Sequence, residues 1–177
     1  MTIFVLFCTW RYVIQNKSML VNDKSETWRG SVKSEWCDYN GHFNLAYYVV
    51  VFDYATDIFY EKLGIGENYL ETVKCSWFTA EAHVCYLAEV FSSEEVYCIS
   101  RIIGFDKKRL HYFHEMYRSE DGILVATNEL LALHVNLQSR KVLEVNNKVW
   151  NNLSSQYELD KVKGKPSQIG RKISLKT

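Results

Sequence analysis

The chain has 177 residues, of which 47% are hydrophobic and 24% charged, a balance that allows one soluble domain with an ordinary core. Its 21 basic and 21 acidic residues cancel, which argues against broad electrostatic binding to nucleic acid or to a membrane surface. Five cysteines without a Cys-x-x-Cys pair argue against a disulfide framework and a structural zinc site, and favour a cytoplasmic protein.

Domain limits follow from composition along the chain. Residues 27–158 are expected to form one domain, because no linker rich in Pro, Gly or Ser interrupts the stretch up to residue 136. An extension of undefined role, residues 1–26, precedes this domain, and a flexible basic tail, residues 159–177, follows it. No run of about 18 uncharged apolar residues is present, so we expect no membrane span.

The first predicted elements are a strand over residues 27–35 and a turn-rich segment over residues 37–44. Residues 45–63 include a β-prone run but are too long for a typical strand. Asn44 is a good N-cap and Gly64 a natural stop, so we predict a helix between them. Its apolar residues run nearly all round, which predicts a helix enclosed on several sides. The expected exposed stripe consists of Asp53, Thr56, Asp57 and Glu61.

Period-two patterns dominate the chain after this helix. Alternation over residues 81–90 predicts a strand with one uniformly apolar face. Further strands are expected over residues 96–104, 110–117 and 124–135, separated by turn-forming clusters, and a short helix over residues 145–153. One long helix followed by four antiparallel strands, with a first strand ahead of it, predicts an α+β domain in which a sheet curls around the helix.

The turn-rich segment resembles a known active-site motif. Asp38-Tyr39-Asn40-Gly41-His42-Phe43-Asn44 is similar to the Asp-x-x-x-His-x-Asn segment of hotdog-fold acyl-CoA and acyl-carrier-protein thioesterases, the 4-hydroxybenzoyl-CoA thioesterase-like superfamily. The later stretches 81–86, 108–114, 126–129 and 133–135 look more specifically like the betainyl-CoA thioesterases of carnitine breakdown. The resemblance covers residues 28–137. It implies a hotdog fold, a homodimer or homotetramer with active sites at the seam between protomers, and no cofactor.

Thioester hydrolysis needs an activated oxygen and donors for the developing oxyanion. Asp38 can supply the oxygen, by attacking directly or by drawing a proton from water, and both modes occur in the family the segment resembles. Asn44 and the exposed amides of residues 41–44 are candidate oxyanion donors at the helix start, and Gly41 permits close backbone approach. His42 can orient Asp38 or Asn44, or polarise the carbonyl. The alternative is a simple helix cap with a loop histidine.

Glu81 and His83 form a second candidate pair, because they share the less apolar face of their strand. Glu81 is a further candidate catalytic group, either as a base or as an anchor for a cationic substrate, and His83 a candidate binding group. The alternative is an ordinary solvated face. His83, His111 and His114 lack a recognised ligand spacing, so we expect no metal site.

Two further groups of residues are candidates for substrate binding. Lys108 and Arg109, with Lys107, form a basic run that can meet the phosphates of coenzyme A or merely belong to a solvated turn. Aromatic rings near the two candidate segments can attract a quaternary ammonium group, or simply pack in the core. These rings belong to Trp36, Tyr39, Tyr47, Trp77, Phe78 and Tyr86.

The sequence therefore favours an acyl-CoA thioesterase for a small acyl group, with betainyl-CoA as a candidate substrate. A thioesterase for aromatic or medium-chain acyl groups is the alternative among enzymes. A non-catalytic hotdog protein that binds acyl thioesters is the alternative from another class.

Overall fold

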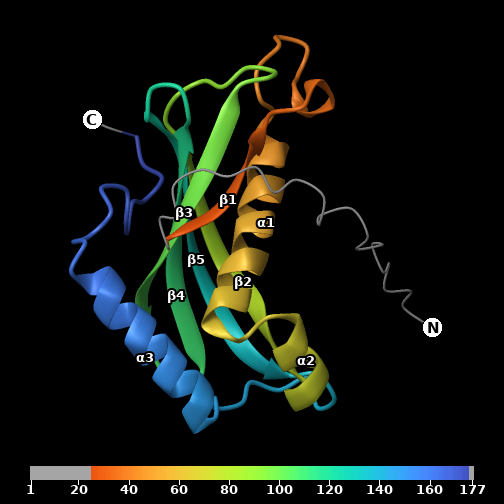
Figure 1. Ribbon diagram of the computed structural model, residues 1–177, viewed down its shortest axis with the longest axis vertical. Coiled ribbons are helices and arrows are strands. Elements are labelled where there is room, and N and C mark those ends of the chain that lie inside the picture. The colour runs from red at the N-terminus through yellow and green to blue at the C-terminus, as the bar shows by residue number, and fades with distance from the viewer. Residues whose placement is uncertain (1–24, 176–177) are drawn as a thin grey trace.

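A computed structural model describes residues 25–175, so the expected extension at residues 1–26 lies almost wholly outside the described residues. Five strands and three α-helices make up the described part of the chain (Figure 1). In chain order these are β1 (Glu26–Ser31), α1 (Leu45–Leu63), α2 (Glu67–Val73), β2 (Cys75–Tyr86), β3 (Glu95–Phe105), β4 (Arg109–Arg118), β5 (Leu124–Asn136) and α3 (Asn147–Lys161).

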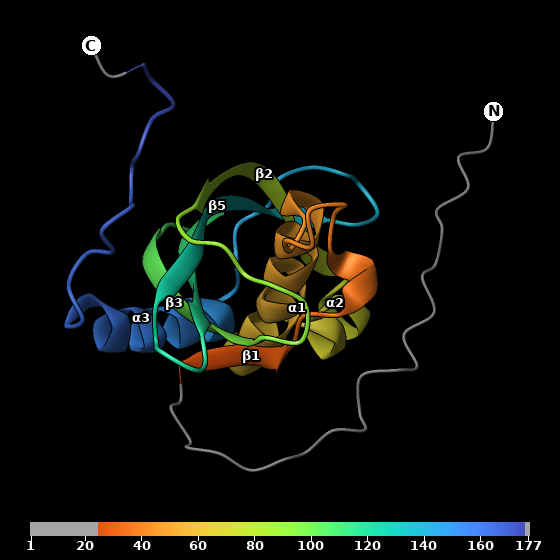
Figure 2. The ribbon, with the colours of Figure 1, turned by 90° about the horizontal axis from the view of Figure 1, so that it is seen from above.

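The strands form one antiparallel sheet in the order β1-β3-β4-β5-β2. Seen from above, this sheet curves around α1, with β1 on one side of the helix and β2 on the other (Figure 2). The arrangement confirms the predicted α+β hotdog fold. Short β1 pairs only with the first half of β3. Farther along β3, α3 packs beside the strand in place of β1. Its buried Asp160 accepts a hydrogen bond from the Ile102 amide at 2.8 Å.

The long helix has the predicted limits and caps. The Asn44 side chain accepts a hydrogen bond from the Ala46 amide, and Gly64 ends the helix in a left-handed conformation with φ of 69°. Asp53 and Glu61 are exposed as expected. Thr56 was wrongly assigned to the exposed stripe, because it is buried against the sheet, where its hydroxyl bonds His114. The partner of Thr56 lies on a strand that is distant in the sequence, so this buried hydrogen bond could not be predicted from the helix alone.

A buried hydrogen-bonded chain lies under the middle of α1. The Thr56 hydroxyl donates to the Phe52 carbonyl, so it accepts from His114 Nε2 at 2.9 Å. His114 Nδ1 then accepts from the Ser100 hydroxyl at 2.6 Å, and Ser100 accepts from Thr27 at 2.6 Å. The shorter bonds of this chain favour the neutral Nε2-protonated tautomer over the alternative in which Thr27 donates to the Cys98 carbonyl, which lies 3.3 Å away. Complete burial lowers the pKa of His114 to about 3.

Three predicted elements have a limit that differs by at least four residues from the structure, and one helix was not predicted. The first strand ends at Ser31 rather than at residue 35, and a single 3₁₀ turn follows at Ser34–Trp36. The short helix α2 was not expected. The alternating stretch after it begins already at Cys75 and leaves the sheet after Tyr86, so residues 87–90 are loop. α3 extends to Lys161, beyond the predicted helix over residues 145–153 and the expected domain limit at residue 158. Within residues 25–175, no helix combines the length and apolar character needed to cross a membrane.

Candidate active site

The segment before α1 folds into a tight turn. The Asp38 amide donates to the His42 carbonyl and the Gly41 amide to the Asp38 carbonyl, each at 2.9 Å. Gly41 has φ of 80°, a conformation that costs any residue with a Cβ. A Cβ at Gly41 would meet no protein atom within 4 Å, so within the chain the turn needs glycine for its backbone angle.

This turn fixes the Asp38 carboxylate. Oδ1 accepts hydrogen bonds from the amides of Asn40 at 2.8 Å and His42 at 3.2 Å. Neither bond uses Oδ2, so one oxygen anchors the side chain while the other is left for chemistry. A carboxylate oxygen held in this way can attack an electrophilic carbon or take a proton from water.

The backbone amides of the turn are less available than the sequence suggests. The amides of Gly41 and His42 bond Asp38, the Phe43 amide donates to Val90 O at 2.8 Å, and the Asn44 amide donates to Trp36 O at 2.9 Å. The expectation of exposed amides at residues 41–44 is therefore wrong. The Ala46 and Tyr47 amides bond Asn44, which leaves the Leu45 amide as the first-turn N–H that none of these bonds uses.

A cavity of about 430 Å³ opens beside Asp38. It lies at the end of the molecule where the turn before α1 meets the end of β2, at the top of Figure 1. Its walls come from the turn, the first residues of α1, the end of β2 and the loop after β2. The lining residues are Asp38, His42, Phe43, Asn44, Leu45, Tyr48, Tyr86, Leu87, Ala88, Glu89 and Val90.

The His42 ring faces the loop after β2. Its Nε2 lies 4.0 Å from Glu89 Oε2, and its ring meets Phe91 edge-on with centroids 5.0 Å apart. The contact of His42 with Asp38 runs through the backbone amide rather than the ring. The ring therefore lines the cavity without orienting the Asp38 carboxylate, in contrast to one of the expected roles.

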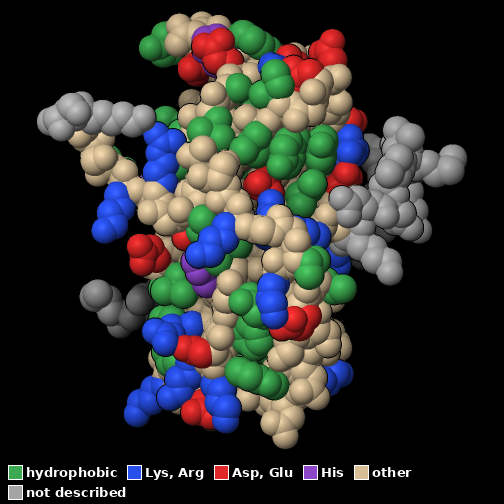
Figure 3. Space-filling model, turned by 90° about the vertical axis from the view of Figure 1, so that its left-hand side faces the viewer, with side chains coloured by type: hydrophobic (Ala, Val, Ile, Leu, Met, Phe, Trp, Pro, Cys, Tyr) green, Lys and Arg blue, Asp and Glu red, His purple; other side chains and the backbone are tan. Residues whose placement is uncertain are grey.

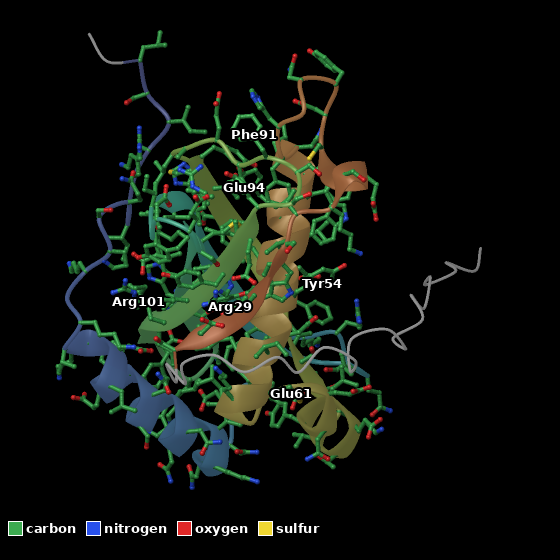
Figure 4. All side chains as sticks on the ribbon, turned by 45° about the horizontal axis from the view of Figure 1, so that its top comes forward. Arg29, Tyr54, Glu61, Phe91, Glu94 and Arg101 are labelled. Atoms are coloured by element: carbon green, nitrogen blue, oxygen red, sulfur yellow. The ribbon has the colours of Figure 1, made fainter. Side chains whose placement is uncertain are left out.

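Residues 87–90 of the loop after β2 form one wall of the cavity, and Arg118 links this loop to the sheet. Arg118 Nη1 donates to the Glu89 carbonyl at 3.1 Å, and its Nη2 pairs with Asp121 at 2.8 Å. The Phe91 amide donates to Glu94 Oε2 at 2.8 Å, and Figure 4 shows these two residues beside the turn that precedes α1. Sequence reasoning missed Glu89, Phe91 and Arg118, because residues 87–90 continue the alternation of the preceding strand.

Only one of the candidate aromatic residues lines the cavity. Tyr86 contributes its ring, which meets Tyr48 edge-on at 5.2 Å. Trp36 and Tyr47 stack on each other behind the turn, and the Tyr39 side chain is 97% exposed. The remaining two lie near the start of β2, at the other end of the sheet. There Trp77 packs on His134 and Phe78 lies under Arg140.

Glu81 and His83 are not brought to Asp38 within the chain. They point away from α1, because their neighbour Ala82 pairs with the core residue Leu130. With His111 and Glu129 they line a separate groove of about 560 Å³, bordered by residues 170–173. Within residues 25–175, no group of three or more His, Cys, Asp or Glu side chains is arranged to hold a metal ion.

The basic run follows β3, at the end of the sheet opposite to Asp38. Arg109 pairs with Asp106, and Lys107 and Lys108 lie 3.8 and 3.9 Å from Glu144. Figure 3 shows Lys and Arg side chains gathered at the lower end of one face of the molecule. Contact between this run and a thioester at Asp38 within one chain would require a ligand that spans the length of the sheet.

The fold and the anchored carboxylate define a class of protein, the hotdog thioesterases, and comparison with known proteins gives the family. A sequence model described as "Thioesterase-like superfamily" matches residues 32–153. The chain belongs to this superfamily, and it is a thioester hydrolase.

Named relatives support this assignment. The chain is 33% identical to a betainyl-CoA thioesterase of Pseudomonas aeruginosa over 149 residues, which cover 84% of this chain and 94% of the relative. It is 36% identical to an L-carnitine dehydrogenase/betainyl-CoA thioesterase of Ruegeria pomeroyi over 63% of this chain, but spans only 22% of that longer protein.

Solved structures agree with the fold. A putative thioesterase from Pseudomonas putida superposes with a TM-score of 0.75 at 34% identity, covering 86% of this chain and 97% of the other. A hypothetical protein from Staphylococcus aureus in complex with CoA superposes with a TM-score of 0.80 at 26% identity, covering 91% and 100%.

Proposed function

We propose that this thioester hydrolase acts on a small acyl-CoA, with betainyl-CoA as its substrate and glycine betaine and coenzyme A as products. The observation that carries the proposal is the Asp38 carboxylate, anchored through one oxygen beside a small cavity at the start of α1. The similarity to the Pseudomonas betainyl-CoA thioesterase, over nearly the whole of that relative, supports the choice of substrate.

In the proposed reaction, the thioester carbonyl lies beside Asp38 with its oxygen toward the Leu45 amide. Two routes fit this placement: Asp38 Oδ2 attacks the carbonyl carbon to form an anhydride that water then cleaves, or Asp38 takes a proton from the attacking water. In both routes the positive end of α1 stabilises the developing oxyanion. In the first route the C–S bond breaks and the thiolate of coenzyme A leaves as the anhydride forms, and water then hydrolyses the anhydride and restores the Asp38 carboxylate. In the second route the C–S bond breaks after water has added to the carbonyl, and the leaving thiolate takes up the proton that Asp38 removed from water.

The test measures release of free thiol from betainyl-, acetyl-, octanoyl- and benzoyl-CoA. We expect Asp38→Asn to lower kcat by at least about 100-fold, because asparagine keeps the Oδ1 anchor but supplies neither a nucleophile nor a base. Asp106→Asn, at the far end of the sheet, is the matched control. Near-normal turnover by Asp38→Asn refutes the assignment of Asp38. Ligand binding without turnover of any substrate favours the binding-protein alternative, and preference for octanoyl- or benzoyl-CoA favours the other thioesterase class.

We also propose a homodimer or homotetramer. β2 is an edge strand of 12 residues, and among the described residues no strand pairs with its outer side. Long uncovered edges invite pairing with a second chain. Light scattering coupled to gel filtration checks this proposal, and a monomer at micromolar concentration contradicts it.

The cytoplasm is the proposed location. Cys37, Cys75, Cys85 and Cys98 are all free thiols in the structure, as expected in a reducing compartment. Fractionation of cells that express the tagged full chain tests this location, and recovery of the chain outside the cytoplasm overturns it.

A further inference from the structure

The cavity beside Asp38 carries negative charge. Among the described residues that line it, two are acidic, Asp38 and Glu89, and none is Lys or Arg. The Glu89 side chain is 69% exposed and meets His42 at 4.0 Å, its one ion-pair contact among the described residues. Glu89 therefore places a solvent-exposed carboxylate, without a Lys or Arg partner among the described residues, in the lining of the cavity.

The negative charge affects the pKa of Tyr48, a buried residue in the wall of the cavity. The pKa of Tyr48 is raised to about 12, mainly by burial and further by Tyr86, Glu94 and Glu89, while Arg118 acts in the opposite direction with a smaller effect. The carboxylates of Glu94 and Glu89 repel a negative charge on the Tyr48 oxygen. By the same electrostatic interaction they attract a cation in the adjoining cavity.

Tyr86 supplies an aromatic surface in the same space. Its ring is 47% exposed, its hydroxyl donates to the Leu45 carbonyl at 3.2 Å, and its edge contact with Tyr48 limits rotation. An oriented and accessible ring of this kind attracts alkylammonium groups through its face.

The shape of a betainyl group makes these contacts selective. Its quaternary nitrogen is two bonds from the thioester carbon, roughly 2.5 Å away by ordinary bond lengths. When that carbon lies beside Asp38, only groups in the same cavity can touch the cation. Trp77 and Phe78 of the same chain, at the other end of β2, therefore do not touch the cation.

We infer that Glu89 and Tyr86 form the site that receives a quaternary ammonium group on the second carbon of the acyl chain, which makes Glu89 the specificity-determining carboxylate of this enzyme. The inference rests on the proposed function, because it assigns the acyl end of the same substrate. Glu89 supplies the charge attraction, and Tyr86 supplies an apolar face that tolerates the three methyl groups.

The test compares betainyl-CoA with 3,3-dimethylbutyryl-CoA, in which carbon replaces the quaternary nitrogen and the shape is kept. The readout is the ratio of the two kcat/KM values, so that general effects on catalysis or folding cancel. We expect Glu89→Gln to lower this ratio by about 10-fold, the loss of one partly screened charge contact. Glu120→Gln, an exposed carboxylate outside the cavity lining, is the control and should leave the ratio unchanged.

Tyr86 gives a second, independent pair of variants. Tyr86→Phe keeps the ring and should keep most of the ratio, whereas Tyr86→Leu should lower it about 5-fold. An unchanged ratio in both Glu89→Gln and Tyr86→Leu overturns the inference while wild-type turnover of betainyl-CoA still supports the proposed function. If the wild type hydrolyses neither thioester, the proposed function fails. In that case the dissociation constants of betainyl-CoA and 3,3-dimethylbutyryl-CoA are compared instead. If Glu89→Gln leaves their ratio unchanged, the inference is overturned as well.

Discussion

His114 lies at the centre of the sheet under α1. We expect its replacement by glutamine, which does not titrate, to make the unfolding free energy less dependent on pH at acidic pH. The His114 ring is completely buried, and its two nitrogens bond the hydroxyls of Thr56 and Ser100. Because both bonds are satisfied by the neutral ring, protonation would place an uncompensated charge among Phe52 and Phe59.

The magnitude follows from the pKa of about 3 in the folded chain, against about 6.5 for an exposed histidine. The unfolded chain binds the proton more readily, so stability is full above pH 6.5 and falls as the pH drops toward 3. Between pH 8 and pH 5 the loss from this one group is about 2 kcal/mol, and it approaches about 5 kcal/mol near pH 3.

The assay is urea unfolding of wild type and His114→Gln at pH 8, 7, 6 and 5, followed by tryptophan fluorescence at one protein concentration. Glutamine does not titrate, so the difference in unfolding free energy between wild type and variant should shrink by about 2 kcal/mol from pH 8 to pH 5. His134, whose pKa burial also lowers, titrates in both proteins and cancels. A difference that stays constant with pH would refute the reasoning.

Two further predictions concern the walls of the cavity and the far core. Arg118→Met keeps the aliphatic stem of the side chain but removes the donor to the Glu89 carbonyl. KM should therefore rise about 10-fold for all acyl-CoAs, with a smaller change in kcat. The control, Arg29→Met on β1, should not raise KM. Trp77→Ala should lower the unfolding free energy by about 3–5 kcal/mol in urea titrations, because Trp77 is buried, yet leave the ratio of betainyl- to 3,3-dimethylbutyryl-CoA turnover unchanged. A selective loss of betainyl-CoA turnover in Trp77→Ala would return this residue to the substrate site.

The long helix and its approach were predictable because their signals are local. Asn44 and Gly64 mark the ends of α1 through interactions with their own neighbours in the chain. The Asp38 turn is equally local, since its anchoring bonds join residues at most four apart. Resemblance to a known motif added the chemistry of this turn to a geometry that the residue types already favoured.

The end of β2 was not predictable, because it is set by a distant strand. Alternation continues to residue 90, but the partner strand β5 begins only at Leu124, and the amides of Leu87 and Ala88 both converge on the Val125 carbonyl. Beyond that point the chain has no strand to pair with, and it crosses to the turn before α1, where the Val90 carbonyl receives the Phe43 amide. Periodicity reports which face a residue would take in a sheet, not where the sheet ends.

The same crossing explains why the candidate aromatic residues were only partly grouped as expected. Trp77 and Tyr86 lie on one strand and share a face of the sheet, yet they belong to opposite ends of the fold. The strand delivers Tyr86 to Asp38, and the loop beyond it adds Glu89, which a continued strand would have carried away from the cavity. With the cation site at Glu89 and Tyr86, substrate specificity depends on where β5 starts. An insertion that shifts the β4–β5 turn should therefore change the ratio of kcat/KM for betainyl-CoA to that for 3,3-dimethylbutyryl-CoA more than it changes kcat.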